Sequence, residues 1–394
     1  MEIASKLSFE NTEVAFQAKT DKELRKANFI FSIVKHHTIA QIATGAVKLG
    51  LALRLPVKGL IKHTVYDHFC AGENIEQSLQ VMDHIGQFGV HSILDYSVEG
   101  EKSEQGFELV AQEVIRTVHE AKKNSNMPFA VFKMTGLASI DLLEKINAGK
   151  SLSEAEESAW EKVKARVDRI CKTCFEQDIP VLIDAEETWI QNPIDALAYE
   201  MMRKYNEKKA IVYNTYQLYR RDSLANLRNA FHEAAMHNYF LGAKLVRGAY
   251  MEKERERAKK MGYADPIQPN KEATDADYNK ALAFCVDNKQ RISFVSGSHN
   301  EYSNQYLAVL MEKHSLNMHD KRVWFSQLYG MSDNISFNLA KAGYNVVKYL
   351  PYGPVEKVMP YLFRRAEENT SVEGQSSREL DMIRRELRRR KESR

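Results

Sequence analysis

The chain has 394 residues, of which 44% are hydrophobic and 28% charged, and its formal net charge is +3. This composition is typical of a globular protein that contains one large domain or two ordinary ones. The small net charge gives no reason to expect nucleic acid as a partner. The four cysteines are too few for a disulfide scaffold, so we expect a reducing compartment.

Residues 1–89 are predicted to form a helical N-terminal arm. The chain begins MEIASKLSFENTEVAF, with acidic residues where a secretory signal needs a basic start and an apolar core. The same stretch is not rich in arginine, so a transit peptide is expected to be absent or already removed. The most apolar stretch, residues 39–62, is interrupted by polar residues and a proline. We therefore expect it to pack as an amphipathic helix rather than to span a bilayer.

From residue 90 onward, short apolar runs rich in β-branched residues alternate with longer helical patterns. Near-continuous apolar runs of this length are typical of parallel strands that are covered on both faces. Eight strands, each followed by a helix, predict a (β/α)8 barrel over residues 90–372. A doubly wound open sheet is the alternative, but the chain has no G-x-G-x-x-G phosphate loop. The predicted strands are 90–97, 129–136, 179–188, 210–219, 242–250, 292–299, 322–330 and 345–353.

Cys171 and Cys174 form a C-x-x-C pair inside a helical pattern. Neither a second cysteine pair nor a nearby histidine pair completes a zinc site, so no metal is expected. We interpret both cysteines as buried or half-buried helix residues.

Polar and charged residues stand at the ends of the predicted strands. In (β/α)8 barrels the catalytic residues come from the carboxyl ends of the strands. Burying lysine or arginine without partners is costly, so we expect a ligand that supplies partners. The excess of cationic groups predicts an anionic ligand, either a small carboxylate or a phosphorylated cofactor. The candidates are Lys133, Asp184, Asn214, Gln217, Lys244, Arg247, Tyr250, Ser298, His299, Asn300, Gln327, Tyr349 and Tyr352, and on the last helix Arg364, Arg365 and Glu368.

Several of these residues also have a purely structural interpretation. Lys133 and Asp184 can pair only to satisfy two buried charges, and Asn300 is suited to cap a helix. Gln327 is suited to a hydrogen-bonded position in the core.

The motifs that carry the candidate residues resemble the proline dehydrogenase family, in its monofunctional, mitochondrial-type branch. The resemblance lies in LIDAEE, KLVRGAY, SHN, QLYGM and above all YLPYGPVEKVMPYLFRRAEEN, which is highly specific. FGVHSILDYSVEGE and GYADPIQPNKEATDADYN extend it, so that it covers most of the chain from about residue 66 to the C-terminus.

The resemblance implies a distorted (β/α)8 TIM-type barrel with non-covalent FAD. Such an enzyme oxidises L-proline to 1-pyrroline-5-carboxylate, the first step of proline catabolism, and passes the electrons to a membrane quinone. The location implied is the bacterial cytoplasm, peripheral on the inner membrane, or the mitochondrial matrix and inner membrane. A 4-hydroxyproline dehydrogenase of the same family, a lyase that forms a Schiff base on Lys133 or Lys244, and a membrane-bound scaffold are the alternatives.

The resemblance also assigns roles to single residues. Asp184 would support the active site through hydrogen bonds, and Lys244 would lie near the flavin N5, where many members carry arginine. The substrate carboxylate would be held by Lys133, Arg364 and Arg365, and the pyrrolidine ring covered by Tyr349 and Tyr361, with Leu328 nearby. The FAD would be lined by Asn214, Arg247, Gly248, Ala249, Ser298, His299 and Asn300, while Glu368 would orient the arginine pair.

The C-terminal segment 373–394 is a basic tail. Residues 377–394 carry eight Lys or Arg and four Asp or Glu, and Leu380, Ile383 and Leu387 recur at helical spacing. We interpret the segment as a helix docked on the barrel with a solvated basic end. A peripheral, salt-sensitive membrane contact is the alternative. Both can hold if the apolar stripe faces the protein and the arginines face lipid.

Overall fold

The structure is a computed structural model that describes residues 7–34, 45, 58–97, 101–371 and 375–393. Most of the stretch 39–62, which is expected to form an amphipathic helix, lies outside the described residues. Within the described ranges, none of the helices combines the length and apolar character needed to cross a membrane.

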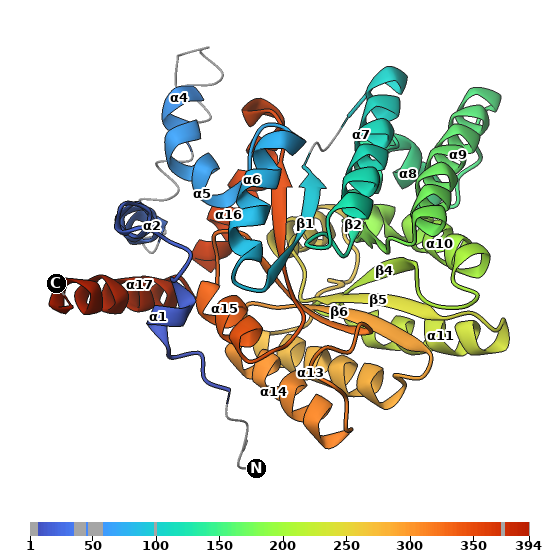
Figure 1. Ribbon diagram of the computed structural model, residues 1–394. Helices are drawn as coiled ribbons and strands as arrows, with labels where there is room; N and C mark the ends of the chain where they lie inside the picture. Colours follow the sequence, from blue (N-terminus) through green and yellow to red (C-terminus); the bar gives the residue numbers. More distant parts are fainter. Residues whose placement is uncertain (1–6, 35–44, 46–57, 98–100, 372–374, 394) are drawn as a thin grey trace.

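In the described part of the chain, eight parallel strands form one sheet that curves into a barrel (Figure 1). Their hydrogen-bonded order is β1-β8-β7-β6-β5-β4-β3-β2. All eight predicted strands are confirmed, but several are shorter than predicted, notably the second and third, which each have four residues. The bounds are β1 Val90–Tyr96, β2 Ala130–Lys133, β3 Val181–Asp184, β4 Val212–Gln217, β5 Leu241–Val246, β6 Ile292–Gly297, β7 Val323–Leu328 and β8 Val346–Tyr352.

Helices follow the strands and surround the barrel (Figure 1). Many begin at a side chain that caps free backbone N–H groups, such as Ser103 before α7 and the Ser153–Glu156 capping box before α9. The helices of the barrel are α7 Glu104–Lys123, α8 Ile140–Asn147, α9 Glu154–Gln177, α10 Thr188–Tyr205, α11 Ser223–Met236, α12 Met251–Met261, α13 Lys271–Asp287, α14 Glu301–Lys313, α15 Asp333–Lys341 and α16 Val355–Ser371, with the short η2 Met134–Gly136 after β2.

The barrel has a seam between its first two strands. No ladder hydrogen bond joins β1 to β2, both of which are fully described, although the two strands contact each other. The backbone N–H of Ser92 instead donates to the carbonyl of Asn126 at 2.8 Å. At the carboxyl end, the ammonium of Lys133 on β2 lies 3.3 Å from the carboxylate of Asp95 on β1. A side-chain ion pair therefore bridges the gap in the ladder.

The interior of the barrel is filled by large apolar side chains. Because successive side chains on a strand point to opposite faces, alternate residues of each strand enter this interior and the others pack against the helices. The interior group is Ile93, Phe129, Val131, Leu182, Ala210, Tyr213, Val295, Trp324, Val347 and Tyr349. The four cysteines are buried free thiols. Cys171 and Cys174 lie in α9, where burial raises the pKa of both, so their interpretation as buried helix residues is confirmed.

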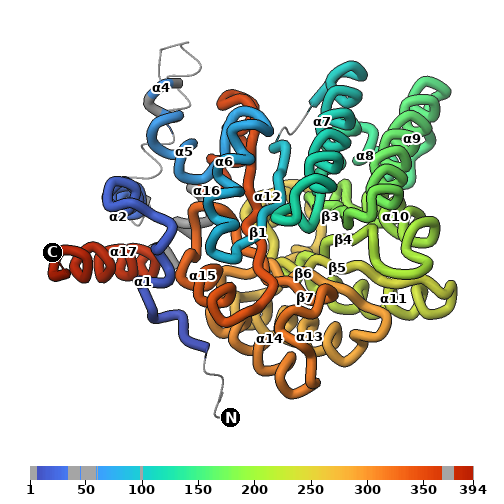
Figure 2. Tube along the Cα trace, viewed as in Figure 1, coloured from blue at the N-terminus to red at the C-terminus, as the bar shows by residue number. Residues whose placement is uncertain are grey.

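The first two helices of the N-terminal arm, α1 and α2, pack with the C-terminal helix beside the barrel, whereas α6 packs on β1 (Figures 1 and 2). The C-terminal helix buries Leu380 and Ile383 against Phe16, Leu24 and Phe31 of the arm. The predicted apolar stripe is thus confirmed, and its partner is the N-terminal arm. The bounds are α1 Thr12–Ala15, α2 Asp21–Val34, α4 Lys58–Ile61, the π-helix η1 Lys62–Tyr66, α5 Asp67–Phe69, α6 Ile75–Gly86 and α17 Gln375–Glu392.

Ion pairs hold α17 in this position. Arg385 lies 2.7 Å from the carboxylate of Glu10, and Arg390 lies 3.0 Å from that of Asp21. Arg390 also donates to the backbone carbonyl of Phe16 at 2.9 Å. Arg378 pairs with Glu301 of α14 at 3.0 Å. Docked arginines of this kind neutralise acidic groups of the arm and the barrel, so the tail is not simply a solvated basic end.

Candidate active site

A layer of charged and polar side chains lies above the apolar interior, where the strands end. We call it the mouth cluster; it consists of Asp95, Lys133, Asp184, Lys244 and Tyr349, from strands β1, β2, β3, β5 and β8. Lys133 and Asp184 are register partners across β2 and β3. Asp95 is 1% exposed and Tyr349 5%, and the side chains of Lys133 and Lys244 are 10% and 9% exposed. The barrel thus gathers predicted site residues from distant parts of the sequence.

Asp184 is the centre of the mouth cluster. Lys244 Nζ donates to its Oδ1 at 2.5 Å, and Tyr349 OH donates to its Oδ2 at 2.7 Å. Lys133 Nζ donates to the same Oδ2 at 3.2 Å. Burial alone would raise the pKa of Asp184, but the two lysines outweigh it and bring the pKa to about 2. Burial and the neighbouring Asp184 raise the pKa of Tyr349, so its phenol stays protonated and serves as a donor.

Asp95 is a member of the cluster that the sequence analysis missed. Its carboxylate lies 3.3 Å from Lys133 Nζ and also accepts a hydrogen bond from the hydroxyl of Ser97. Lys133 Nζ donates to Tyr349 OH at 3.0 Å as well. The signal was available, because Asp95 stands at the end of a predicted strand in the same way as Asp184 does.

The arginine pair belongs to α16 and its two members point to different partners. The guanidinium of Arg365, a buried residue, lies 5.2 Å from the centre of the Tyr361 ring. That of Arg364 lies 5.6 Å from the Tyr250 ring, at the start of α12. Such distances fit cation–π contacts. Leu328, at the end of β7, packs on both the barrel interior and the cluster that contains Tyr361. The side chain of Glu368 lies outside the described residues.

Arg247 is held by three partners beyond the end of β5. Its Nε donates to Asp275 at 2.6 Å, and its two terminal nitrogens donate to Ser298 and Ser303, each at 2.8 Å. Gly248 follows with φ +131°, and a Cβ there would lie 2.5 Å from the ring of Tyr219. Only glycine fits this close approach. Ala249 continues the turn into α12.

His299 and Asn300 follow β6. Asn300 caps α14 by accepting the N–H of Ser303 at 2.9 Å, so its interpretation as a helix cap is confirmed. The Nδ1 of His299 lies 2.9 Å from the hydroxyl of Ser332. Burial, together with the nearby cations Lys348, Arg365 and Arg247, lowers the pKa of His299 to about 3. The imidazole is therefore neutral, and the positive charge of Arg365 is one of the charges that lower its pKa.

Three further candidate residues make their hydrogen bonds in the barrel wall, outside the mouth cluster. Asn214 lies on the helix-facing side of β4, where its amide donates to Asp195 of α10 at 2.8 Å. The hydroxyl of Tyr352 donates to Glu113 of α7 at 3.1 Å. Gln327 donates to the carbonyl of Ser298 and accepts from Ser336, so its interpretation as a core amide is confirmed. The physical reason is the alternation of strand side chains, which turns Asn214 and Tyr352 away from the interior.

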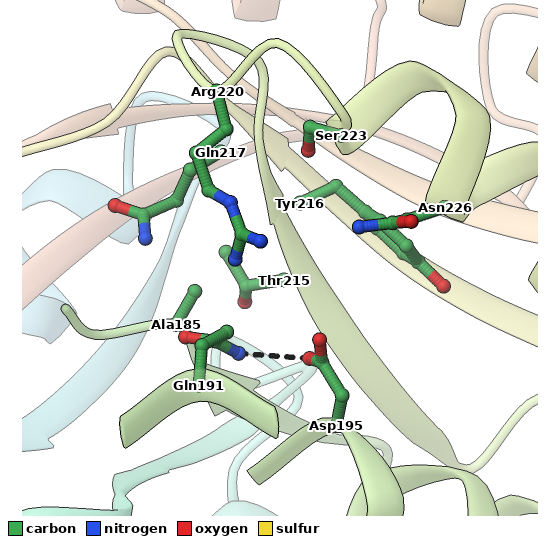
Figure 3. Close-up of a pocket in the computed structure, with 9 residues that line it drawn as sticks. All are labelled: Ala185, Gln191, Asp195, Thr215, Tyr216, Gln217, Arg220, Ser223 and Asn226. Atoms are coloured by element: carbon green, nitrogen blue, oxygen red, sulfur yellow. Dashed lines mark hydrogen bonds between the residues drawn. The ribbon is translucent and has the colours of Figure 1, made fainter. Parts of the chain in front are cut away.

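Asp195 also borders a small polar hollow beside the carboxyl ends of β3 and β4 (Figure 3). Gln191 donates to Asp195 at 2.8 Å, and Arg220 extends into the hollow from the opposite side (Figure 3). Burial raises the pKa of Asp195. The hollow belongs to the packing of α10 and α11 on the barrel wall, and it is lined by Ala185, Gln191, Asp195, Thr215, Tyr216, Gln217, Arg220, Ser223 and Asn226.

A parallel eight-stranded barrel with charged groups at the carboxyl ends of its strands is the architecture of TIM-barrel enzymes. Residues 78–378 match the proline dehydrogenase family, and the chain belongs to that family. Its members are oxidoreductases that act on a CH–NH bond.

Two curated relatives and one solved structure illustrate the similarity. The chain is 32% identical to proline dehydrogenase 1, mitochondrial, of Dictyostelium discoideum, over 92% of this chain and 72% of the relative. It is 33% identical to hydroxyproline dehydrogenase of Xenopus laevis, over 98% of this chain and 90% of the relative. Proline utilization A (PutA) from Bdellovibrio bacteriovorus shares the fold with a TM-score of 0.69 and 20% identity, over 93% of this chain. This chain spans 37% of the length of that PutA protein.

Proposed function

We propose that the protein uses FAD to oxidise L-proline to 1-pyrroline-5-carboxylate, the first step of proline catabolism. The observation that carries this proposal is the mouth cluster, in which Lys133, Lys244 and Tyr349 converge on Asp184 in a barrel of the proline dehydrogenase family. Two relatives, named as proline and hydroxyproline dehydrogenases, support a cyclic amino acid as the substrate.

In this proposal Lys133, Arg364 and Arg365 bind the carboxylate of the substrate. The planar guanidinium of arginine suits a carboxylate because it offers two parallel N–H donors. Lys133 already faces Asp95 and Asp184, so a bound carboxylate would take the place of one of these contacts. The apolar ring of proline would then pack on Tyr349, Tyr361 and Leu328, as the resemblance implies.

The donor set of the site fits an anionic cofactor such as FAD. Lys244 supplies a cation in the mouth, Arg247 supplies a fixed guanidinium, and the turn at Gly248 lets backbone approach closely. FAD, when bound, takes up a hydride from the substrate carbon next to nitrogen. The protein's own contribution is to hold the two reactants in a productive geometry. The further residues proposed along the cofactor are Ala249, Ser298, His299 and Asn300, with Asn214 behind them in the wall and Glu368 beside the arginine pair.

Asp184 is better suited to positioning than to proton removal. A carboxylate with a pKa of about 2 is a weak base, and it already accepts three hydrogen bonds. We therefore propose that Asp184 fixes Lys133, Lys244 and Tyr349, and that solvent takes the proton of the substrate amine.

Oxidation of 4-hydroxyproline is the second candidate function. The similarity to a relative named hydroxyproline dehydrogenase over 98% of the chain favours it. Against it stands Tyr349, whose phenol is held by Asp184 and Lys133 in the space where a ring hydroxyl would need room. A Schiff-base lyase is less well supported, because Lys244 is hydrogen-bonded to Asp184, and an ammonium ion held in this way is not an amine nucleophile.

Transfer of electrons to a membrane quinone is a further part of the proposal. Three cations of α17, Arg384, Arg388 and Lys391, are exposed and lie three or four residues apart. We call them the outer basic row. The apolar stripe of the helix is buried in the arm, which leaves the outer basic row exposed towards an anionic leaflet, although Arg384 also donates to Asn28 at 3.3 Å. The relatives named as mitochondrial are compatible with such a location.

One experiment separates the candidate functions. The purified protein should show flavin absorbance that L-proline bleaches under anaerobic conditions, and bleach more slowly with 4-hydroxyproline. Faster bleaching by 4-hydroxyproline would favour the second candidate. A colourless protein that borohydride traps with a carbonyl substrate would favour the lyase, and a protein with neither signal would be a scaffold.

A further inference from the structure

A second group of buried charges surrounds Asp333, at the turn that joins β7 to α15. Lys348 of β8 is 1% exposed, and its Nζ lies 2.8 Å from the carboxylate of Asp333. Lys19, between α1 and α2, lies 3.2 Å from the other oxygen of Asp333. Glu379 of α17, itself 7% exposed, accepts the backbone N–H of Ser332 at 3.0 Å. The arm, the barrel and the C-terminal helix thus meet at one turn.

The turn is held in an unusual backbone conformation. Ser332 has φ 51° and ψ 43°, in the left-handed region that non-glycine residues rarely adopt. Lys348 Nζ donates to the carbonyl oxygens of Leu328, at 3.3 Å, and of Met331. The carboxylate of Glu379 accepts the N–H of Ser332. The conformation of Ser332 is therefore fixed jointly by β8 and by α17.

The side chain of Ser332 is directed at the candidate active site. Ser332 occupies the N-cap position of α15, where a serine hydroxyl usually accepts a backbone N–H. Among the described residues its hydroxyl makes no such capping bond, and it lies 2.9 Å from Nδ1 of His299. The serine thus links Glu379, through its backbone, to His299, through its side chain.

Anchoring of α17 does not account for Glu379. The helix is already held by Arg390, which donates to the Phe16 carbonyl and pairs with Asp21, and by the burial of Leu380. Burial raises the pKa of Glu379 to about 7, which shows that the surroundings disfavour its charge. An apolar residue would serve docking alone without this cost. The position of the carboxylate is explained by the N–H that it accepts.

We propose that Glu379 is a positioning residue of the active site, which fixes Ser332 and thereby the orientation of the His299 imidazole. This inference rests on the proposed function, in which His299 lies along the FAD. Glu379 itself lies just beyond the segment 78–378 that matches the family. The C-terminal helix is then part of the wall of the site as well as an attachment of the arm.

The test uses the flavin-loaded full chain and three variants. Glu379→Gln keeps an oxygen that can accept the Ser332 N–H, whereas Glu379→Leu removes the acceptor. Glu386→Gln is the matched control, because Glu386 is another buried carboxylate of α17 that pairs with Arg389 and Arg390 of the same helix and not with the turn before α15. The readouts are the ¹⁵N signals of the His299 ring, assigned with His299→Gln, and the dissociation constant of FAD.

Glu379→Leu should shift the His299 signals and weaken FAD binding about three- to tenfold, the range expected when one hydrogen bond is lost. Glu379→Gln and Glu386→Gln should leave both readouts close to those of the wild type. Unchanged His299 signals in Glu379→Leu would overturn the proposal, and so would equal shifts in Glu386→Gln, which would indicate undocking of the helix.

A fourth variant keeps the proposal testable if Glu379→Leu does not fold. Ser332→Ala leaves α17 intact and removes the hydroxyl, and it should shift the His299 signals in the same direction; an unshifted His299 would refute the link. Failure of the proposed function gives a different result. In that case the wild type would not bind flavin at all, while the His299 signals would still report on Ser332 and Glu379.

Discussion

Replacing Asp184 by asparagine tests the mouth cluster directly. The change keeps the shape of the side chain but removes the charge that Lys133 and Lys244 share. Lys133 retains Asp95 at 3.3 Å, whereas Lys244 loses its carboxylate partner in a site where its side chain is only 9% exposed. The variant therefore leaves a buried ammonium without a carboxylate partner, with the Tyr349 ring at 4.7 Å as a remaining contact.

The lowered pKa of Asp184 gives an order of magnitude for the effect. A shift from 3.8 to about 2 corresponds to about 2 kcal/mol at about 1.4 kcal/mol per pKa unit. Removing one partner of a buried ion pair costs about 3–5 kcal/mol in general. We expect Asp184→Asn to lower the free energy of unfolding by about 2–4 kcal/mol at pH 7. Since the folded pKa lies below the unfolded one, this stabilisation is present above about pH 4 and is lost as the pH falls towards 2.

Urea unfolding followed by circular dichroism measures the effect. The double variant Asp184→Asn/Lys244→Met removes the stranded ammonium as well, so it should regain at least half of the lost stability. A loss below about 1 kcal/mol in the single variant would be no larger than that of an average substitution and would refute the reasoning. A double variant that is less stable than the single one would show that the loss of the carboxylate does not destabilise Lys244.

Four further predictions concern the substrate, the cofactor and the membrane. Arg364→Met and Arg365→Met should each lower kcat/KM for L-proline by roughly ten- to several-hundred-fold with FAD still bound, and near-normal kinetics in both would exclude the carboxylate clamp. Tyr349→Ser should narrow the preference for L-proline over 4-hydroxyproline in steady-state assays; a wild type that prefers hydroxyproline contradicts this. Lys244→Met should lower the flavin midpoint potential, while Lys244→Arg keeps most of the activity; an unchanged potential would mean that the lysine is distant from N5. Charge reversal of the outer basic row should reduce co-sedimentation with anionic liposomes about tenfold at low salt without loss of flavin. Equal binding by the wild type and the variant would show that the row does not contact the membrane.

The strands and the helix caps could be predicted because they depend on local sequence. Eight apolar runs covered on both faces indicate eight parallel strands wherever they occur in the chain. Asn300 was recognisable as a cap from its type and its place before an amphipathic pattern. The family resemblance added the order of the site residues along these elements.

The face of a strand on which a residue lies could not be predicted in the same way. The run of residues 210–219, AIVYNTYQLY, has no regular alternation of apolar and polar residues to show which of them point inward. Asn214 was therefore grouped with residues of the mouth, although its neighbours Tyr213 and Thr215 are the ones on the inner side of β4. Tyr352 was misplaced for the same reason, and its hydroxyl reaches α7.

Contacts between distant charges were also hidden. Lys348 lies within an apolar run, and nothing in the sequence indicates that it pairs with Asp333. The second ion pair of Asp333, with Lys19, is equally hidden. The pairing of Arg385 and Arg390 with the first residues of the chain depends on how the tail and the arm fold together. The individual roles assigned to the substrate and cofactor residues stay predictions until the variants are measured.

The seam of the barrel has a consequence for synthesis on the ribosome. β1 forms its ladder with β8, and the 249 residues between Tyr96 and Val346 must be made before that partner exists. At translation rates of about 5–20 residues per second, the wait is on the order of 10–50 s. During this time the strand VHSILDY has no partner with which to form its ladder, so we expect it to be a segment of the nascent barrel that a chaperone protects.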